Sequence, residues 1–96
     1  MPNRILKESI CASDNLNLAS PNEESLFFRL IVNCDDYGRM DGRPSVIRAK
    51  CYPLRLDSIT DSVIATLLNK LQQINLVKLY EVDGKPYLYL ISWDKH

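Results

Sequence analysis

The sequence predicts an α+β fold in which helices come first and a β-hairpin comes last. Helix start signals precede apolar residues at helical spacing, and an Asp-Gly dipeptide separates two apolar and aromatic runs near the C-terminus. The 96 residues allow one domain with a thin core, and no run approaches the ~18 apolar residues of a membrane span. Because the start of the chain is also too polar for a signal peptide, we expect a cytoplasmic protein.

The first long helix is predicted to begin at residue 21. Ser20 is a suitable N-cap, Pro21 suits the first helical position, and Glu23 completes a capping box with the serine. Arg29 and Asn33 are expected on the face opposite the apolar one. The apolar face is predicted from residues that recur at helical spacing, which are Phe27, Leu30, Ile31 and Cys34.

Glycine and proline mark the limits of the next elements. Gly38 is expected to end the first helix by adopting a left-handed conformation. Residues 39–42 are too few for more than a turn or a single β-bridge. Pro44 starts a second helix over residues 45–52, and Pro53 stops it because the residue before a proline avoids the helical region.

Helical spacing predicts which faces of the second and third helices are buried. In the second helix, Arg48 and Lys50 are expected to point outward, and the inward set is Val46, Ile47 and Cys51. A tight link over residues 54–59 leads to Thr60, a suitable N-cap for the third helix, and Asn75 suits the left-handed position after it. One apolar stripe is predicted along the third helix, formed by Val63, Ile64, Leu67, Leu68, Leu71 and Ile74.

Two strands are predicted after the third helix. Residues 76–82 and 85–91 are rich in β-branched, aromatic and apolar side chains, and the Asp-Gly pair at 83–84 is a strong hairpin signal. Pro86 suits the start or the edge of a sheet. The order of helix, short extended piece, helix, helix and hairpin is that of a winged helix-turn-helix, with the hairpin as the wing.

An arm precedes this predicted domain. Residues 1–19 are expected to form the arm, and residues 20–96 the winged-helix domain, as the N-terminal part of a longer protein. The apolar residues Ile5, Leu6 and Ile10 fit a short amphipathic helix. This helix either packs back on the domain or reaches a neighbouring subunit.

The sequence favours neither enzymatic nor metal chemistry. Cys11, Cys34 and Cys51 are odd in number and lack C-x-x-C spacing, so we interpret them as free thiols that serve as small apolar side chains. Asp35 and Asp36 fit a polar cluster at a helix end better than a metal site, because no His or Glu spacing accompanies them. No nucleophile–base set and no Gly-rich phosphate loop can be assembled, so we expect no catalytic residue and no cofactor.

Charge is balanced overall but uneven along the chain. Twelve Lys and Arg residues face twelve Asp and Glu residues, so the strongly basic signature of a nucleic-acid-binding domain is absent. Residues 39–55 nevertheless carry five basic side chains and one acidic one. Arginine binds phosphate oxygens in a bidentate manner. The predicted phosphate contacts, with Lys85 at the wing tip, are Arg39, Arg43, Arg48, Lys50 and Arg55. The alternative is a solvated basic surface.

The third helix is the expected recognition helix. A row of uncharged polar residues lies opposite its apolar stripe, and Asn or Gln amides can pair with adenine in the major groove. The candidates that face the groove, including a lysine for a phosphate, are Ser62, Thr66, Asn69, Lys70 and Gln73. A solvated helix face is the alternative. Asp57 and Asp61 count against DNA, because they lie at the helix start, which usually enters the groove.

Aromatic residues gather at the hairpin and beyond it. They can stack on the bases of a single strand, or they can cover the core of the hairpin or mediate self-association. These residues are Tyr80, Tyr87, Tyr89 and Trp93. Trp93 also suits a junction with a further domain.

Five segments along nearly the whole chain carry a family resemblance. They are RILKESI at 4–10, DDYGRMDG at 35–42, YPL at 52–54, LYEVDGKPYL at 79–88 and WDKH at 93–96. Together they resemble the N-terminal domain of phage and prophage replication initiation proteins of low-GC Gram-positive bacteria, often called replisome organisers. They are also similar to the N-terminal domain of DnaD-like primosome proteins.

The resemblance implies a winged helix that binds origin or single-stranded DNA and self-associates during replication initiation. A further domain of such proteins engages the replicative helicase or its loader. We therefore expect the DNA-binding domain of a replisome organiser that positions the replication machinery on DNA. The alternatives are a self-association or protein-interaction module of a primosome protein, in which the arm and the hairpin build a homo-oligomer, and a transcription regulator of the same fold.

Overall fold

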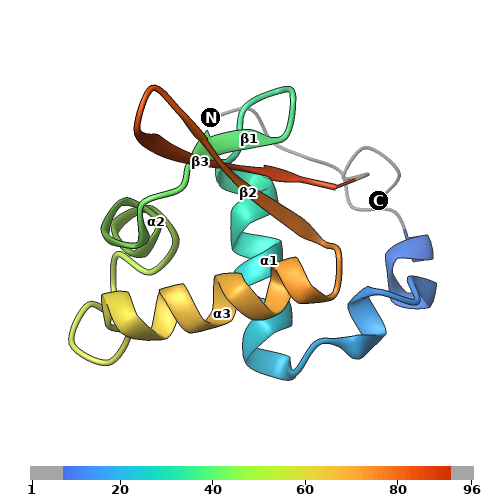
Figure 1. The fold of residues 1–96 in the computed structure, drawn as a ribbon. Coiled ribbons are helices and arrows are strands. Elements are labelled where there is room, and N and C mark those ends of the chain that lie inside the picture. Colours follow the sequence, from blue (N-terminus) through green and yellow to red (C-terminus); the bar gives the residue numbers. More distant parts are fainter. Residues whose placement is uncertain (1–7, 92–96) are drawn as a thin grey trace.

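A computed structural model describes residues 8–91, in which three α-helices lie against one face of a three-stranded antiparallel sheet (Figure 1). The strand order is β1-β3-β2, so the last strand lies in the middle. The elements follow one another as α1 (Pro21–Asn33), β1 (Arg39–Asp41), α2 (Pro44–Cys51), α3 (Asp61–Gln73), β2 (Val77–Val82) and β3 (Lys85–Leu90). The α+β class is confirmed, and the arrangement is compatible with a winged helix.

The start of α1 is the predicted capping box. The Ser20 backbone N–H donates to Glu23 Oε1 at 2.9 Å, and the Glu23 backbone N–H donates to Ser20 Oγ at 3.4 Å. The predicted end of the helix is wrong, because α1 stops at Asn33. Gly38 is left-handed, with φ 75°, but it lies in the turn into β1, where Asp35 accepts its backbone N–H.

Residues 39–42 form more than the predicted turn or bridge. They contain β1, which pairs with the middle strand so that Met40 lies opposite Leu88 and Asp41 lies opposite Tyr87. Gly42, the residue after β1, also lies close to β3, since its backbone N–H donates to Pro86 O at 3.0 Å. A Cβ atom at Gly42 would lie 2.8 Å from the backbone carbonyl carbon of Tyr87, so this position requires glycine for space.

The connection between α2 and α3 is longer than predicted. Instead of a tight link, residues 52–60 separate the two helices in a series of turns. The Arg55 backbone N–H donates to Tyr52 O, and the Ile59 backbone N–H donates to Arg55 O. Leu54 at the tip of this loop is 96% exposed.

Local signals correctly predict the limits of α3 and the hairpin. Thr60 Oγ1 accepts the Val63 backbone N–H, and Asn75 is left-handed after the helix, with φ 61°. Asp83 and Gly84 both have positive φ, as a type I′ hairpin turn requires. The predicted apolar stripe is right except at its start, where Val63 is exposed.

The core lies between the helices and the inner face of the sheet. Its fully buried side chains include Phe27, Ile47, Ile64 and Leu88. No helix within residues 8–91 has the length and apolar character needed to cross a membrane.

The N-terminal arm packs back on this core. Two short 3₁₀ helices, η1 (Glu8–Ala12) and η2 (Leu16–Leu18), replace the predicted amphipathic helix, of which residues 5–7 lie outside the described part. Ile10 and Leu16 are buried in the same core as the three α-helices. Ile10 is therefore already covered within the domain, which leaves it unavailable to a neighbouring subunit.

The polar face of α1 contacts α2, and one of the thiols departs from its prediction. Arg29 and Asn33 are half-buried, and Arg29 Nη1 donates to Cys51 O at 2.6 Å across the α1–α2 contact. Cys34 and Cys51 serve as small core residues, whereas Cys11 is exposed. Burial raises the pKa of the Cys51 thiol to about 11, so this thiol stays protonated at neutral pH.

We expect Gly42→Ala to lower the free energy of unfolding by about 1–3 kcal/mol, because the added methyl group forces β1 away from β3. Urea unfolding followed by circular dichroism measures this change. Ser45→Ala, at an exposed position in the next helix, is the matched control and should change stability by less than about 0.5 kcal/mol. Equal stability of the two variants would contradict the close approach described above.

Candidate nucleic-acid interface

The candidate recognition surface is the solvent side of α3. Ile64, Leu68 and Leu71 are buried against the core, which turns the predicted polar row outward. Every member of that row is exposed, namely Ser62, Thr66, Asn69, Lys70 and Gln73. The Thr66 hydroxyl donates to the Ser62 backbone carbonyl at 3.0 Å, so its proton is used within the helix.

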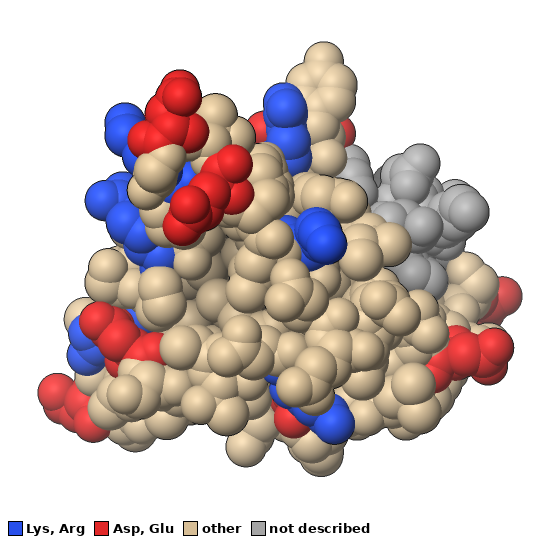
Figure 2. All heavy atoms as spheres, in the orientation of Figure 1, with Lys and Arg blue, Asp and Glu red and all other residues tan. Residues whose placement is uncertain are grey.

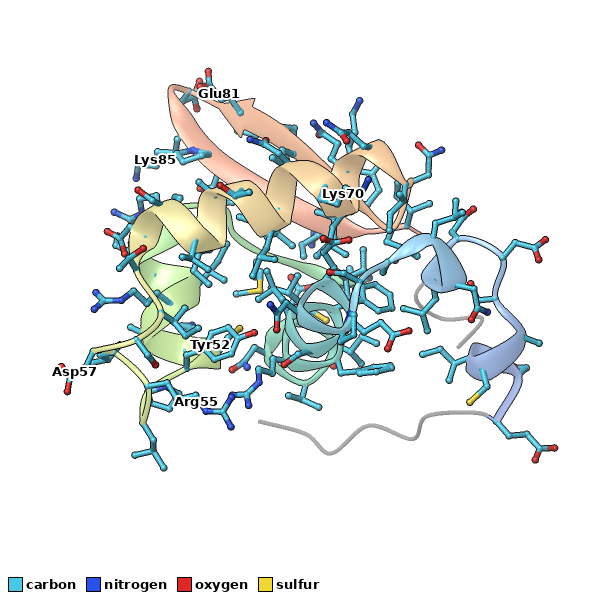
Figure 3. The ribbon with its side chains drawn as sticks, turned by 90° about the horizontal axis from the view of Figure 1, so that it is seen from below. Tyr52, Arg55, Asp57, Lys70, Glu81 and Lys85 are labelled. Carbon is cyan, nitrogen blue, oxygen red and sulfur yellow. The ribbon has the colours of Figure 1, made fainter. Side chains whose placement is uncertain are left out.

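Charge is sparse on this surface. Figure 2 shows that the face over α3 is mostly uncharged and that the Lys and Arg side chains at its edges alternate with Asp and Glu. Lys70 lies on α3, and Lys85 lies near the hairpin tip (Figure 3). Neither lysine forms an ion pair with any residue between 8 and 91. The α3 surface thus combines a neutral polar row with Lys70, and Lys85 adds an exposed cation at the hairpin.

Two of the predicted phosphate-binding arginines are held by carboxylates. Arg43 forms a bidentate pair with Asp41, in which Nε lies 3.0 Å from Oδ1 and Nη2 lies 2.7 Å from Oδ2. Hydrogen bonds from Arg43 hold the pKa of Asp41 below its ordinary value. Arg39 Nε lies 3.6 Å from Asp35 Oδ2. These pairs neutralise part of the basic segment that the sequence suggested.

Arg48 does not point outward as predicted. Its Nε donates to Ile59 O at 2.6 Å, its Nη2 donates to Leu56 O, and its Nη1 lies 3.7 Å from Asp61 Oδ1. The side chain is 29% exposed. Arg48 therefore fastens the long α2–α3 loop to α2 and to the start of α3, because carbonyls inside a loop offer acceptors that a guanidinium can bind together.

The remaining predicted cations do not form one patch. Lys50 and Arg55 are both exposed. Arg55 and Asp57 lie in the α2–α3 loop on the side of the molecule away from Lys70 and Lys85 (Figure 3). The predicted basic cluster of residues 39–55 is therefore divided among internal contacts and separate surfaces.

The tyrosines of the hairpin do not cover its core. Leu79 and Leu88 occupy the inner face of the sheet, whereas Tyr80, Tyr87 and Tyr89 lie on the face turned away from the helices. Two-residue alternation through the Asp-Gly turn already contained this signal, since it places all three rings on one face. Trp93 lies outside the described residues.

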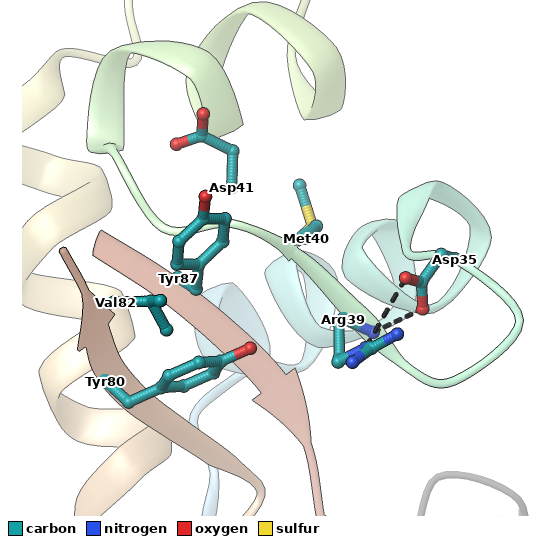
Figure 4. A pocket seen from close by; sticks show the side chains of 7 residues that line it. All are labelled: Asp35, Arg39, Met40, Asp41, Tyr80, Val82 and Tyr87. Carbon is teal, nitrogen blue, oxygen red and sulfur yellow. Dashed lines mark hydrogen bonds and ion pairs between the residues drawn. The ribbon is translucent and has the colours of Figure 1, made fainter. Parts of the chain in front are cut away.

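An open hollow of about 320 Å³ adjoins these tyrosines (Figure 4). It lies beside β1 and the hairpin and is lined by Asp35, Arg39, Met40, Asp41, Tyr80, Val82 and Tyr87. Asp35 Oδ1 accepts the backbone N–H groups of Tyr37 and Arg39, at 2.8 and 2.9 Å, so this carboxylate closes a turn. Among residues 8–91, no group of three or more His, Cys, Asp or Glu side chains is placed to hold a metal ion.

Comparisons with protein-family models, curated proteins and solved structures found no match to this chain. Neutral amides, two lysines and exposed aromatic rings form hydrogen bonds, bind phosphates and stack on flat rings, respectively.

We expect Arg48→Ala to destabilise the fold by about 1–3 kcal/mol, because hydrogen bonds to a charged donor are lost and the loop carbonyls lose their partner. Lys50→Ala on the same helix is the matched control and should cost less than about 0.5 kcal/mol. Chemical unfolding of both variants tests this difference. A neutral Arg48→Ala variant would mean that the guanidinium does not hold the loop.

The Asp41–Arg43 pair should also contribute to the pH dependence of stability. Because the pKa of Asp41 is lowered in the folded state, its contribution is present above the unfolded pKa of about 4 and is lost as the pH falls through the folded value. Unfolding in urea at about pH 6 and about pH 2.5 should show a smaller loss for Asp41→Asn than for the wild type. The difference will be modest, since the pair is partly exposed. Identical losses would show that the pair contributes nothing.

Proposed function

We propose that this chain is a winged-helix DNA-binding domain of a phage-type replication initiation protein, with α3 as the recognition helix and the hairpin as the wing. The observation that carries the proposal is the topology. A hairpin follows directly after the third helix, and its second strand pairs with both β2 and β1. This order places an extended β-element next to an exposed polar helix, which suits a helix that enters a major groove.

The proposed DNA contacts are mostly uncharged, with two lysines in place of a cluster of basic side chains. Asn69 and Gln73 read base edges through their amides, while Lys70 and Lys85 contact phosphates on either side. Ser62 and Thr66 add neutral hydrogen-bonding groups. With only two phosphate contacts from this side, single domains bind weakly and several copies are needed for tight binding.

The replication role rests on the family resemblance of the sequence motifs. Under this proposal the domain places a helicase or helicase loader, bound by another region of the full protein, at a DNA site. A transcription regulator of the same fold would use the same DNA-binding surface.

A self-association module is the second candidate. Its support is the pairing of Arg39 and Arg43 with carboxylates, together with the exposed apolar side chains of Leu54 and Leu56 in the α2–α3 loop. The burial of Ile10 counts against assembly through the arm. Light scattering of the wild type and of Leu54→Ser distinguishes this candidate, because a loop-mediated oligomer should dissociate in the variant.

Fluorescence anisotropy with duplex DNA at two salt concentrations tests the DNA-binding proposal. Lys70→Gln and Lys85→Gln should each weaken binding on all sequences and reduce the slope of log affinity against log salt by about 0.9. Asn69→Ala should instead relax sequence preference, because an amide–base contact contributes about 1–3 kcal/mol of discrimination. Arg55→Gln, on another side of the molecule, is the control and should have little effect. Duplex binding that none of the α3 and wing variants alters would overturn these roles.

A further inference from the structure

The face of the sheet turned away from the helices combines aromatic rings with cations, and the α3 surface has no such aromatic rings. Two-residue alternation and the observed register place one set of side chains on this outer sheet face. The set consists of Arg39, Asp41, Lys78, Tyr80, Val82, Lys85, Tyr87 and Tyr89. The buried set, including Leu88 and Leu90, lies on the inner face.

Three tyrosine rings form the centre of the outer sheet face. The ring centroids of Tyr80 and Tyr87 are 5.8 Å apart, with 27° between the ring planes, and Tyr80 is also 5.8 Å from Tyr89 at 60°. Tyr89 is 39% exposed, and the open hollow described above borders Tyr80 and Tyr87 (Figure 4). The cluster therefore presents aromatic rings beside a space that can take another flat ring.

Cations flank these rings. Lys78 and Arg39 lie on either side of Tyr89 across the sheet, and Lys85 begins the same strand. Two carboxylates border the hollow on this face: Asp41 is bound by Arg43, and Asp35 lies 3.6 Å from Arg39 Nε. Arg39 is 53% exposed, and its contacts are a 3.6 Å approach to Asp35 and a position 5.0 Å from the Tyr37 ring centroid; surface contacts of this kind contribute little free energy, so Arg39 can also bind another anion.

We propose that the outer sheet face binds single-stranded nucleic acid, with unpaired bases stacked on the tyrosines and phosphates bound by Arg39, Lys78 and Lys85. Unpaired bases expose the flat faces that aromatic side chains contact, whereas a duplex hides them within its stack. This site shares Lys85 with the proposed duplex contacts but none of the polar row of α3, so the inference goes beyond those contacts.

A second copy of this chain fits the outer sheet face less well. A two-fold contact would place the cations of two identical faces, Arg39, Lys78 and Lys85, in one interface, where Asp41 is already bound by Arg43 and offers them little compensation. Strand-to-strand pairing through the free edge of β2 is also hindered, since Gln72 Oε1 already accepts the Leu79 backbone N–H at 2.8 Å.

Fluorescence anisotropy of the full chain with labelled oligo-dT and with a duplex of equal length tests the proposal. Tyr89→Leu should weaken oligo-dT binding about tenfold, because it removes a ring and keeps an apolar side chain. Tyr89→Phe, the matched control, should bind as the wild type does. Lys78→Gln should weaken binding and lower its salt dependence.

Thermal unfolding and light scattering of each variant accompany the titrations. Oligo-dT binding that is absent, or that Tyr89→Leu and Lys78→Gln leave unchanged, would overturn the site. A wild-type oligomer that dissociates in Tyr89→Leu, with no oligo-dT binding, would assign this face to a second copy and also overturn it. If the wild type binds oligo-dT but not the duplex, and Tyr89→Leu weakens the oligo-dT binding, the α3 interface is rejected and the outer sheet face is supported.

Discussion

The register of β3 between its two neighbours determines where the polar and aromatic side chains of the sheet lie. Leu88 and Leu90 of β3 are buried against the helices, and the left-handed pair at 83–84 sets which residue of β2 faces which residue of β3. Because side chains alternate along a strand, a slip by one residue would bury Tyr87 and Tyr89 and expose the leucines. The cost of exposing those leucines keeps the aromatic rings on the outer face.

Charge compensation inside the domain determines which cations remain available. Arg43 and Arg48 belong to the most basic stretch of the sequence, yet each is engaged by partners of the fold. Sequence distance hides this for Arg48, whose partners Ile59 and Asp61 lie more than ten residues away. The outcome is a molecule in which exposed lysines, rather than Arg43 and Arg48, are available to an anionic ligand.

Features set by neighbouring residues could be predicted from the sequence, and features set by distant partners could not. The capping box at Ser20, the left-handed Asn75 and the hairpin turn depend on residues within one turn of each other, so their patterns were sufficient. The predicted end of α1 was wrong because the left-handed Gly38 belongs to a separate turn after the helix, which the Asp35 carboxylate closes. The outward polar row of α3 was predictable from its apolar stripe.

The loop held by Arg48 offers a place to modify the molecule without disturbing its fold. Its inner carbonyls, at Leu56 and Ile59, are fixed by the guanidinium, whereas its tip at Leu54 is surrounded by solvent. Exposed tips of this kind tolerate inserted peptides better than held segments do. An epitope or a fluorophore attachment site grafted between residues 53 and 55 would report on the domain from a position away from Lys70 of α3 and Lys85 of the hairpin.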